Sequence, residues 1–129
     1  MENQRVVYLD THAAVWLLEG DIDWLTKAGR RAFDSAEVRV SPVVLLELQF
    51  LHELGRLKKS PKYVIAKLES TLGAGICGTP LPVIIDHALA ETWTRDPFDR
   101  LIVGHARANR SLLLTADETI LQHYAKALC

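Results

Sequence analysis

The sequence lacks the features that mark disulfide-rich, zinc-stabilised and membrane-spanning proteins. It contains two cysteines, Cys77 and Cys129, which can form at most one disulfide, and no C-x-x-C pair or Cys/His cluster at zinc spacing. No apolar run approaches the roughly 20 residues that cross a bilayer, and no signal peptide precedes the first strand-like segment. We therefore expect a cytoplasmic protein with no structural zinc and no membrane contact.

Nucleotide-binding glycine motifs and a large net charge are also absent. Neither G-x-x-x-x-G-K-[ST] nor G-x-G-x-x-G occurs. The 15 Lys and Arg side chains nearly balance the 16 Asp and Glu side chains, so the net charge is −1. One basic stretch contains Arg56, Lys58, Lys59, Lys62 and Lys67. This stretch could contact phosphates, although a solvated surface is the more common role of such a run.

The composition is that of a folded domain able to build a core. Hydrophobic residues make up 49% of the 129 residues and charged residues 24%, which is ordinary for a globular protein of one domain. Strand-like runs alternate with helical segments along the chain. This alternation predicts a single α/β domain over residues 1–129, with helices on both faces of a mostly parallel sheet of four or five short strands.

Prolines and capping residues mark the predicted element boundaries. Strands are expected over residues 5–9, 38–40 and 111–115 and near Ile76, and helices over 11–19, 26–35, 43–57, 60–72, 86–93, 96–109 and 118–127. Ser60 and Asp86 are suitable N-caps, and Pro42 and Pro61 suit a first helical turn. The order of the strands in the sheet stays open.

Two acids follow strand-like runs. Asp10 ends V-V-Y-L-D, and Asp117 lies two residues after L-L-L-T. Ligands of open parallel sheets bind beyond the carboxyl ends of the strands, so both carboxylates could project over the same edge. Either acid alone could equally be a helix N-cap.

Three further acids lie in helical segments. Glu47 is surrounded by apolar residues in V-V-L-L-E-L-Q-F-L, where an isolated charge would cost several kcal/mol, so it needs a partner, a cation or water. Alternatively, Glu47 and Gln49 share a narrow wet stripe. Asp96 before Pro97 is a natural N-cap, and Asp99 suits either the helix dipole or a site shared with other acids.

Asp10, Glu47, Asp99 and Asp117 could together form one site. Four carboxylates within several ångströms of one another would repel strongly and favour protonation unless cations bind. Ligation by oxygen alone favours Mg²⁺ or Mn²⁺ over zinc, and metal-assisted hydrolysis of a phosphodiester suits such a site. Without these four charges the net charge of −1 becomes +3, which is compatible with a polyanionic substrate.

Four segments in order carry a resemblance to a known family: V-V-Y-L-D-T-H-A-A-V-W-L-L, S-P-V-V-L-L-E-L, R-D-P-F-D-R-L-I-V-G-H-A and L-L-L-T-A-D-E. The chain closely resembles the PIN-domain ribonucleases, in particular the VapC-like toxins of type II toxin-antitoxin systems. The resemblance implies a PIN-like three-layer α/β/α fold and a Mg²⁺-dependent endoribonuclease, with Mn²⁺ as a substitute. It assigns the catalytic and metal-binding roles to Asp10, Glu47, Asp99 and Asp117, with Thr11, Asp96 and Thr115 in support.

The four acids suggest a mechanism, and the resemblance also implies partners. We hypothesise that Asp10 and Asp99 would hold the main metal ion, with Glu47 and Asp117 completing the cluster through a second ion or ordered waters. An activated water would attack the phosphorus of single-stranded RNA without a covalent enzyme intermediate. A cognate antitoxin would cover the acidic cleft, and a second copy of the chain would form a homodimer. The apolar helices over 43–57 and 60–72 are candidate surfaces for these contacts, or ordinary core packing. His12 could contact RNA, but we expect it to point into the helix packing.

The sequence departs from the family in two places. Thr94 lies where many members carry His, and residues 124–129 offer little room for the family's further edge strand.

Two alternative functions are disfavoured. A Mg²⁺-dependent phosphatase or phospho-acceptor domain is disfavoured because Asp10-Thr11-His12 lacks the second acid expected two residues after a nucleophile. A non-catalytic PIN-like module that binds RNA or a partner would gain nothing from clustered repulsion.

Overall fold

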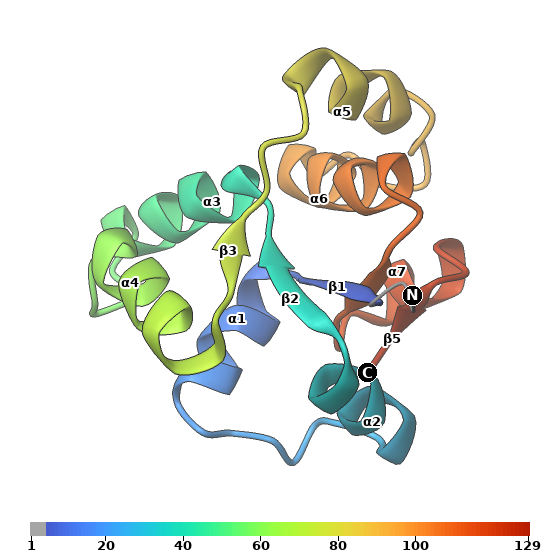
Figure 1. The fold of residues 1–129 in the computed structure, drawn as a ribbon. Coiled ribbons are helices and arrows are strands. Elements are labelled where there is room, and N and C mark those ends of the chain that lie inside the picture. Colours follow the sequence, from blue (N-terminus) through green and yellow to red (C-terminus); the bar gives the residue numbers. More distant parts are fainter. Residues whose placement is uncertain (1–4) are drawn as a thin grey trace.

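The computed structural model describes residues 5–129 as an α/β fold around a parallel sheet (Figure 1). The described strands are β1 (Val6–Leu9), β2 (Glu37–Val40), β3 (Gly75–Ile76), β4 (Leu112–Leu114) and β5 (Ala127–Leu128), in the order β3-β2-β1-β4-β5. The helices are α1 (Thr11–Leu18), α2 (Lys27–Ser35), α3 (Pro42–Glu53), α4 (Pro61–Leu72), α5 (Leu81–Ala88), α6 (Pro97–Ala108) and α7 (Glu118–His123). The predicted fold class is confirmed.

Strand β1 occupies the centre of the sheet because its residues are apolar on both faces. Val7, Tyr8 and Leu9 are at most 1% exposed, as expected for a central strand of a covered parallel sheet. From β1 the chain builds β2 and β3 on one side, and later β4 and β5 on the other. The sheet therefore has a topological switch point beside β1, which is where α/β sheets form ligand sites.

The strand register places the carboxyl ends of strands β1, β2 and β4 at the same level. Leu9 at the end of β1 is paired with Val40 of β2 and with Leu114 of β4. The residues that follow these strands, including Asp10 and Thr115, consequently emerge side by side at one edge of the sheet.

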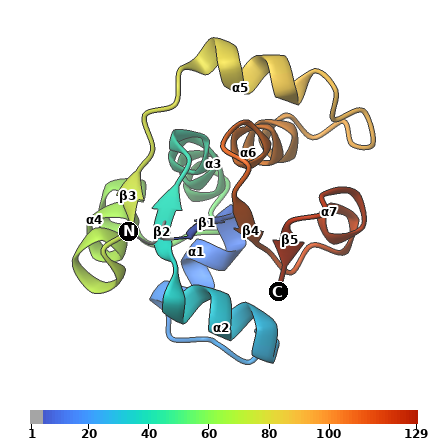
Figure 2. The same cartoon turned by 45° about the vertical axis from the view of Figure 1, so that its right-hand side comes forward.

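The helices cover the sheet and extend beyond it. Helices α1, α3 and α4 contact one another, and α6 contacts both α3 and β4. Helix α5 lies on the outside of α6, at the opposite end of the molecule from α2 (Figure 2). Fully buried side chains of strands and helices fill the space between them, among them Leu48, Leu68, Ile102, Leu113 and Ile120. No helix within residues 5–129 has the length and apolar character of a membrane span.

Several predicted helix boundaries are wrong, among them the end of α3, both ends of α5 and the end of α7. Helix α3 ends at Glu53 rather than near residue 57, because the chain turns at Gly55, whose φ of 76° is easily adopted only by glycine. Helix α5 begins at Leu81 rather than after Asp86, since Pro82 in its first turn has a backbone angle already suited to helix.

The expectation that the C-terminus has little room for an edge strand is also wrong. Helix α7 ends at His123, earlier than predicted, and Tyr124 already has an extended backbone. Ala127 and Leu128 then pair in parallel with Leu113 and Leu114 as strand β5. The room for this strand comes from the shortness of α7.

Gly104 in the middle of α6 permits the close approach of α5. A Cβ atom at Gly104 would lie 2.9 Å from the backbone nitrogen of Ala88 and 3.0 Å from the carbonyl oxygen of Ile84. Both partners are backbone atoms, so a side chain here would push the two helices apart.

We expect Gly104→Ala to destabilise the fold by about 1–3 kcal/mol, because overpacking against backbone outweighs the higher helix propensity of alanine. Urea unfolding monitored by circular dichroism measures the effect. Gly78→Ala is the matched control, since a Cβ there meets nothing within 4 Å. A Gly104→Ala variant at least as stable as the wild type would contradict this packing argument.

Candidate active site

Asp10 lies directly after β1 and is 8% exposed. Its Oδ1 atom accepts a 2.8 Å hydrogen bond from the backbone N–H of Ala13, which makes it the N-cap of α1. Its Oδ2 atom accepts a hydrogen bond from the Thr115 hydroxyl, which follows the neighbouring strand β4. Asp10 is thus both a helix cap and a carboxylate held in place at the switch point.

Glu47 extends from α3 toward Asp10 rather than sharing a wet stripe with Gln49. Its carboxylate is half-buried and accepts a hydrogen bond from the hydroxyl of Thr11, the first residue of α1. Gln49 is exposed and donates instead to Glu53, at 2.6 Å. The partner that Glu47 required is therefore a hydroxyl beside the strand end.

The remaining acids cluster at the starts of α6 and α7. Asp96 caps α6 by accepting from the backbone N–H groups of Phe98 and Asp99, at 2.8 and 3.2 Å, and Asp99 lies half-buried in the same turn. Asp117 caps α7 by accepting from the N–H groups of Thr119 and Ile120, at 2.9 and 3.0 Å. Both predicted helix starts are confirmed.

One cavity of about 400 Å³ brings all four predicted acids together. Its lining is Asp10, Thr11, His12, Trp16, Glu47, Asp96, Asp99, Ile102, Ala116 and Asp117. The predicted supporting residues Thr11 and Asp96 line the same cavity, and Thr115 reaches it through its hydrogen bond to Asp10. The acids lie far apart in sequence, so the fold alone makes them neighbours.

Burial and mutual repulsion raise the carboxyl pKa values in this cavity. Burial, and then the charges of Asp96 and Asp117, raise the pKa of Asp99 to about 7. Burial raises the pKa of Asp10 to about 6 despite its hydrogen bonds, and burial also raises the pKa of Glu47. The predicted electrostatic conflict is therefore present in the folded chain.

No Lys or Arg side chain forms an ion pair with this cluster within the described chain, although the nearby His12 acts against the rise in the pKa values of Asp10 and Glu47. The ion pairs there are Arg39 with Glu37 and Arg107 with Glu91, and neither touches the cavity acids. Carboxylate and hydroxyl oxygens are the donors available, a set that suits Mg²⁺ or Mn²⁺ better than zinc. In the conformation of residues 5–129, no three acidic, His or Cys side chains stand close enough to hold one ion, so binding would require the carboxylates to draw together.

His12 does not point into the helix packing as predicted. It is exposed, lines the cavity, and has its ring 5.8 Å from that of Trp16. The inner face of α1 is occupied instead by Ala13, Ala14 and Leu17. The short alanines let α1 pack closely on its neighbours and leave His12 on the cavity side.

A buried hydrogen bond links the two helices that carry Glu47 and Asp99. His105 of α6 is fully buried, and its Nδ1 atom lies 2.7 Å from the hydroxyl of Ser41, the N-cap of α3. Burial lowers the pKa of His105 to about 4, so the ring is neutral at neutral pH. Within the described residues its Nε2 atom has no hydrogen-bond partner.

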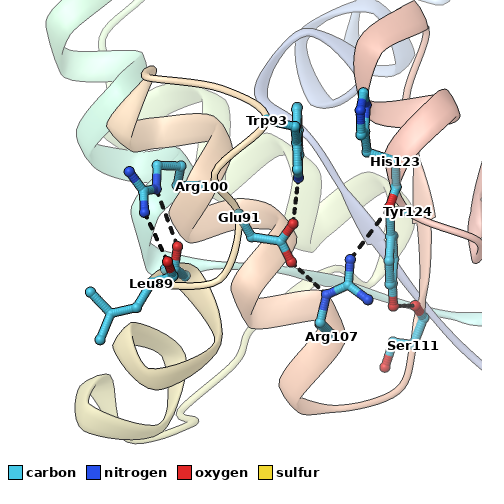
Figure 3. A network of polar contacts seen from close by, with 9 residues as sticks. Leu89, Glu91, Trp93, Arg100, Arg107, Ser111, His123 and Tyr124 are labelled. Carbon is cyan, nitrogen blue, oxygen red and sulfur yellow. Dashed lines mark hydrogen bonds and ion pairs between the residues drawn. The ribbon is translucent and has the colours of Figure 1, made fainter.

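The sequence reasoning missed a polar network centred on Glu91 (Figure 3). Glu91 is 2% exposed and accepts from the Arg107 Nε and the Trp93 Nε1, both at 2.5 Å. Trp93 stacks on His123 with ring centroids 4.9 Å apart, and Arg107 lies 4.9 Å from the Tyr124 ring. The only sequence signal was an acid within the otherwise apolar A-L-A-E-T-W.

This network connects both helices that begin with cavity acids. Glu91 and Trp93 belong to the loop before Asp96, Arg107 belongs to α6, and His123 ends α7. The network therefore joins the C-terminal ends of α6 and α7, whereas Asp99 and Asp117 lie at the N-terminal ends of these helices.

Comparisons with known proteins agree with this geometry. The family model described as "PIN domain" matches residues 7–127, so the chain belongs to the PIN-domain family, a family of nucleases. A comparison with curated proteins found no match.

Several solved structures share the fold. A chain of VapBC2 from Rickettsia felis, bound to a promoter DNA fragment, has a TM-score of 0.64 and 19% identity over 95% of this chain and 96% of that chain. A chain of DNA-bound VapBC from Salmonella typhimurium has a TM-score of 0.60 and 18% identity, covering 98% and 96% respectively. VapBC-1 from nontypeable Haemophilus influenzae gives 0.63 and 17%, with 95% of each chain covered.

The metal-free protein should lose stability as the pH rises from about 4 to about 7. The folded-state pKa values of Asp10 and Asp99, about 6 and 7, exceed the ordinary value of 3.8, so the stabilising protons are fully bound below about pH 4 and lost through pH 6–7. Urea unfolding in EDTA should show a smaller pH dependence for Asp99→Asn than for the wild type. Equal pH dependence in both proteins would contradict the electrostatic cluster.

Arg107→Leu should cost more stability than Glu91→Gln. Removing Arg107 leaves the buried Glu91 carboxylate without its cation, at a cost of about 2–3 kcal/mol. Glutamine at position 91 carries no charge, keeps one acceptor oxygen for one of the two donors, and leaves an Arg107 side chain that is 39% exposed to water. Chemical unfolding at pH 7 compares the two variants. The reverse order of stabilities would show that the ion pair does not hold this part of the fold.

Proposed function

We propose that this protein is a Mg²⁺-dependent endoribonuclease, with Mn²⁺ as a substitute, that hydrolyses single-stranded RNA as the toxin of a type II toxin-antitoxin module. The observation that carries the proposal is the cavity in which Asp10, Glu47, Asp99 and Asp117 meet without a cationic partner in the described chain. Membership of the PIN-domain family and similarity to chains of VapBC complexes support it.

The four carboxylates would hold the metal ion. When bound, Mg²⁺ would activate a water molecule and offset the charge on the phosphodiester. Thr115 fixes one oxygen of Asp10 while the Ala13 N–H fixes the other, so this carboxylate is oriented before any ligand arrives. Such preorganisation reduces the rearrangement that the reaction requires.

The neighbouring residues position the other acids. Thr11 holds the Glu47 carboxylate toward the cavity, and Asp96 caps the helix turn that presents Asp99. Asp117 uses Oδ1 to cap α7, which leaves its Oδ2 free of described hydrogen bonds. These contacts therefore hold Glu47, Asp99 and Asp117 at the cavity.

The proposed partners are a cognate antitoxin and a second copy of the chain. Helix α3 contributes both to the core and to an exposed surface, because Val43, Val44 and Leu48 are buried whereas Leu46 is 60% exposed. The solved neighbours are VapBC complexes, which supports an antitoxin as partner. The homodimer and the cytoplasmic location stay predictions.

Two other functions make different predictions. A phosphatase or phospho-acceptor domain would form an aspartyl phosphate at Asp10, and the family match disfavours this function. A non-catalytic PIN-like module would bind RNA without cutting it. The clustering of four carboxylates with raised pKa values in three of them favours catalysis, because a binding surface for a polyanion has no use for such repulsion.

Asp10→Asn and Asp99→Asn should each reduce cleavage of single-stranded RNA by about 100-fold or more, because each removes a ligand charge from the cavity. Gel analysis of labelled RNA with Mg²⁺ and with EDTA measures the rates. Asp34→Asn is the control, since Asp34 is an exposed acid of α2 outside the cavity. Equal cleavage by wild type and Asp10→Asn would refute the assignment.

A further inference from the structure

A second cavity of about 310 Å³ continues the carboxylate cavity along α3. The two cavities share His12, Glu47 and Asp96, so they form one continuous groove. The extension is lined further by Phe50, Phe98 and Arg56, among others. Its volume lies at the lower end of the range for small-ligand sites.

Two phenylalanine rings face each other in this extension. Phe50 of α3 and Phe98 of α6 have ring centroids 5.6 Å apart at an angle of 42°. Phe50 lies one helical turn after Glu47, on the same side of α3. The Phe50 side chain is 48% exposed, so much of its surface is open to solvent at the groove.

The far end of the extension is basic. Arg56 lines it and forms no ion pair within the described residues. Exposed Lys58 and Lys59 follow Arg56 in the loop before α4. The basic stretch noted in the sequence therefore begins where the aromatic groove ends, with the carboxylates at the other end.

We propose that this extension is a nucleotide subsite, in which an unpaired RNA base stacks on Phe50 and Phe98 and a neighbouring phosphate binds Arg56. The inference rests on the proposed function and names how its substrate is held. Base stacking on aromatic side chains tolerates any base, and the cation that lines the same extension would bind one phosphate of a single strand while another phosphate reaches the carboxylates.

The charge pattern favours RNA over a protein segment as the occupant. Glu47 and Asp96 line the end of the extension that it shares with the carboxylate cavity, and Arg56 is the one Lys or Arg side chain among its described lining residues. A peptide that carries a cation to the carboxylates would meet Arg56 as a like charge, whereas Arg56 attracts a polyanion. A divalent ion held by the carboxylates would offset their charge, so that the scissile phosphate would bind at that end.

Cleavage kinetics with a labelled single-stranded oligoribonucleotide test the subsite. Phe50→Leu should raise KM about 5- to 100-fold with kcat little changed, and Phe50→Trp should restore KM because it keeps an aromatic face. Arg56→Gln should raise KM and weaken the salt dependence of binding, with Arg56→Lys restoring both. Leu54→Ala is the matched control, since Leu54, the C-cap of the same helix, is 52% exposed but outside the groove.

The outcomes separate this inference from the proposed function. Wild type that cleaves RNA while Phe50→Leu and Arg56→Gln keep its KM would overturn the subsite alone and leave the groove to a protein segment. Wild type that neither cleaves nor binds the oligoribonucleotide would overturn both proposals. A fall in kcat without a change in KM would place Phe50 in the support of the carboxylates rather than in substrate binding.

Discussion

The alignment of the carboxyl ends of the parallel strands β1, β2 and β4 is the constraint on which the site depends. Leu9, Val40 and Leu114 lie side by side, so whatever follows β1, β2 and β4 must share one edge of the sheet. The chain uses that edge for acids. Asp10 follows β1 directly, and the hydroxyl of Thr115 after β4 reaches across to its carboxylate. A shift of one residue in the β1–β4 pairing would separate this pair.

The site is electrostatically costly, and the rest of the structure restrains it. Three cavity acids have raised pKa values, so the metal-free fold favours protons where a nuclease needs carboxylates. The caps at the starts of α1, α6 and α7 tie acids to backbone N–H groups, and the Glu91 network holds α6 against α7. Stabilising interactions elsewhere in the fold thus offset the repulsion among the cavity carboxylates, as is common for functional sites.

Local chemistry made much of the fold and the acid cluster predictable. Asp10, Asp96 and Asp117 precede helices in the sequence, and each is an N-cap in the structure. Glu47 could be singled out because a charge amid apolar residues needs a partner, and Thr11 supplies it.

Long-range features were beyond such reasoning. The strand order, the β5 pairing and the Glu91–Arg107 pair join segments through tertiary packing, for which short-range patterns carry no signal. The exposure of His12 was mispredicted because it depends on which side of α1 meets the sheet.

Calorimetric titration of the metal-free protein with Mn²⁺ measures whether the clustered carboxylates hold a divalent ion. We expect saturable binding by the wild type and at least tenfold weaker binding by Asp99→Asn. A wild type that binds no Mn²⁺, or a variant that binds it equally well, would rule out a metal site at these carboxylates.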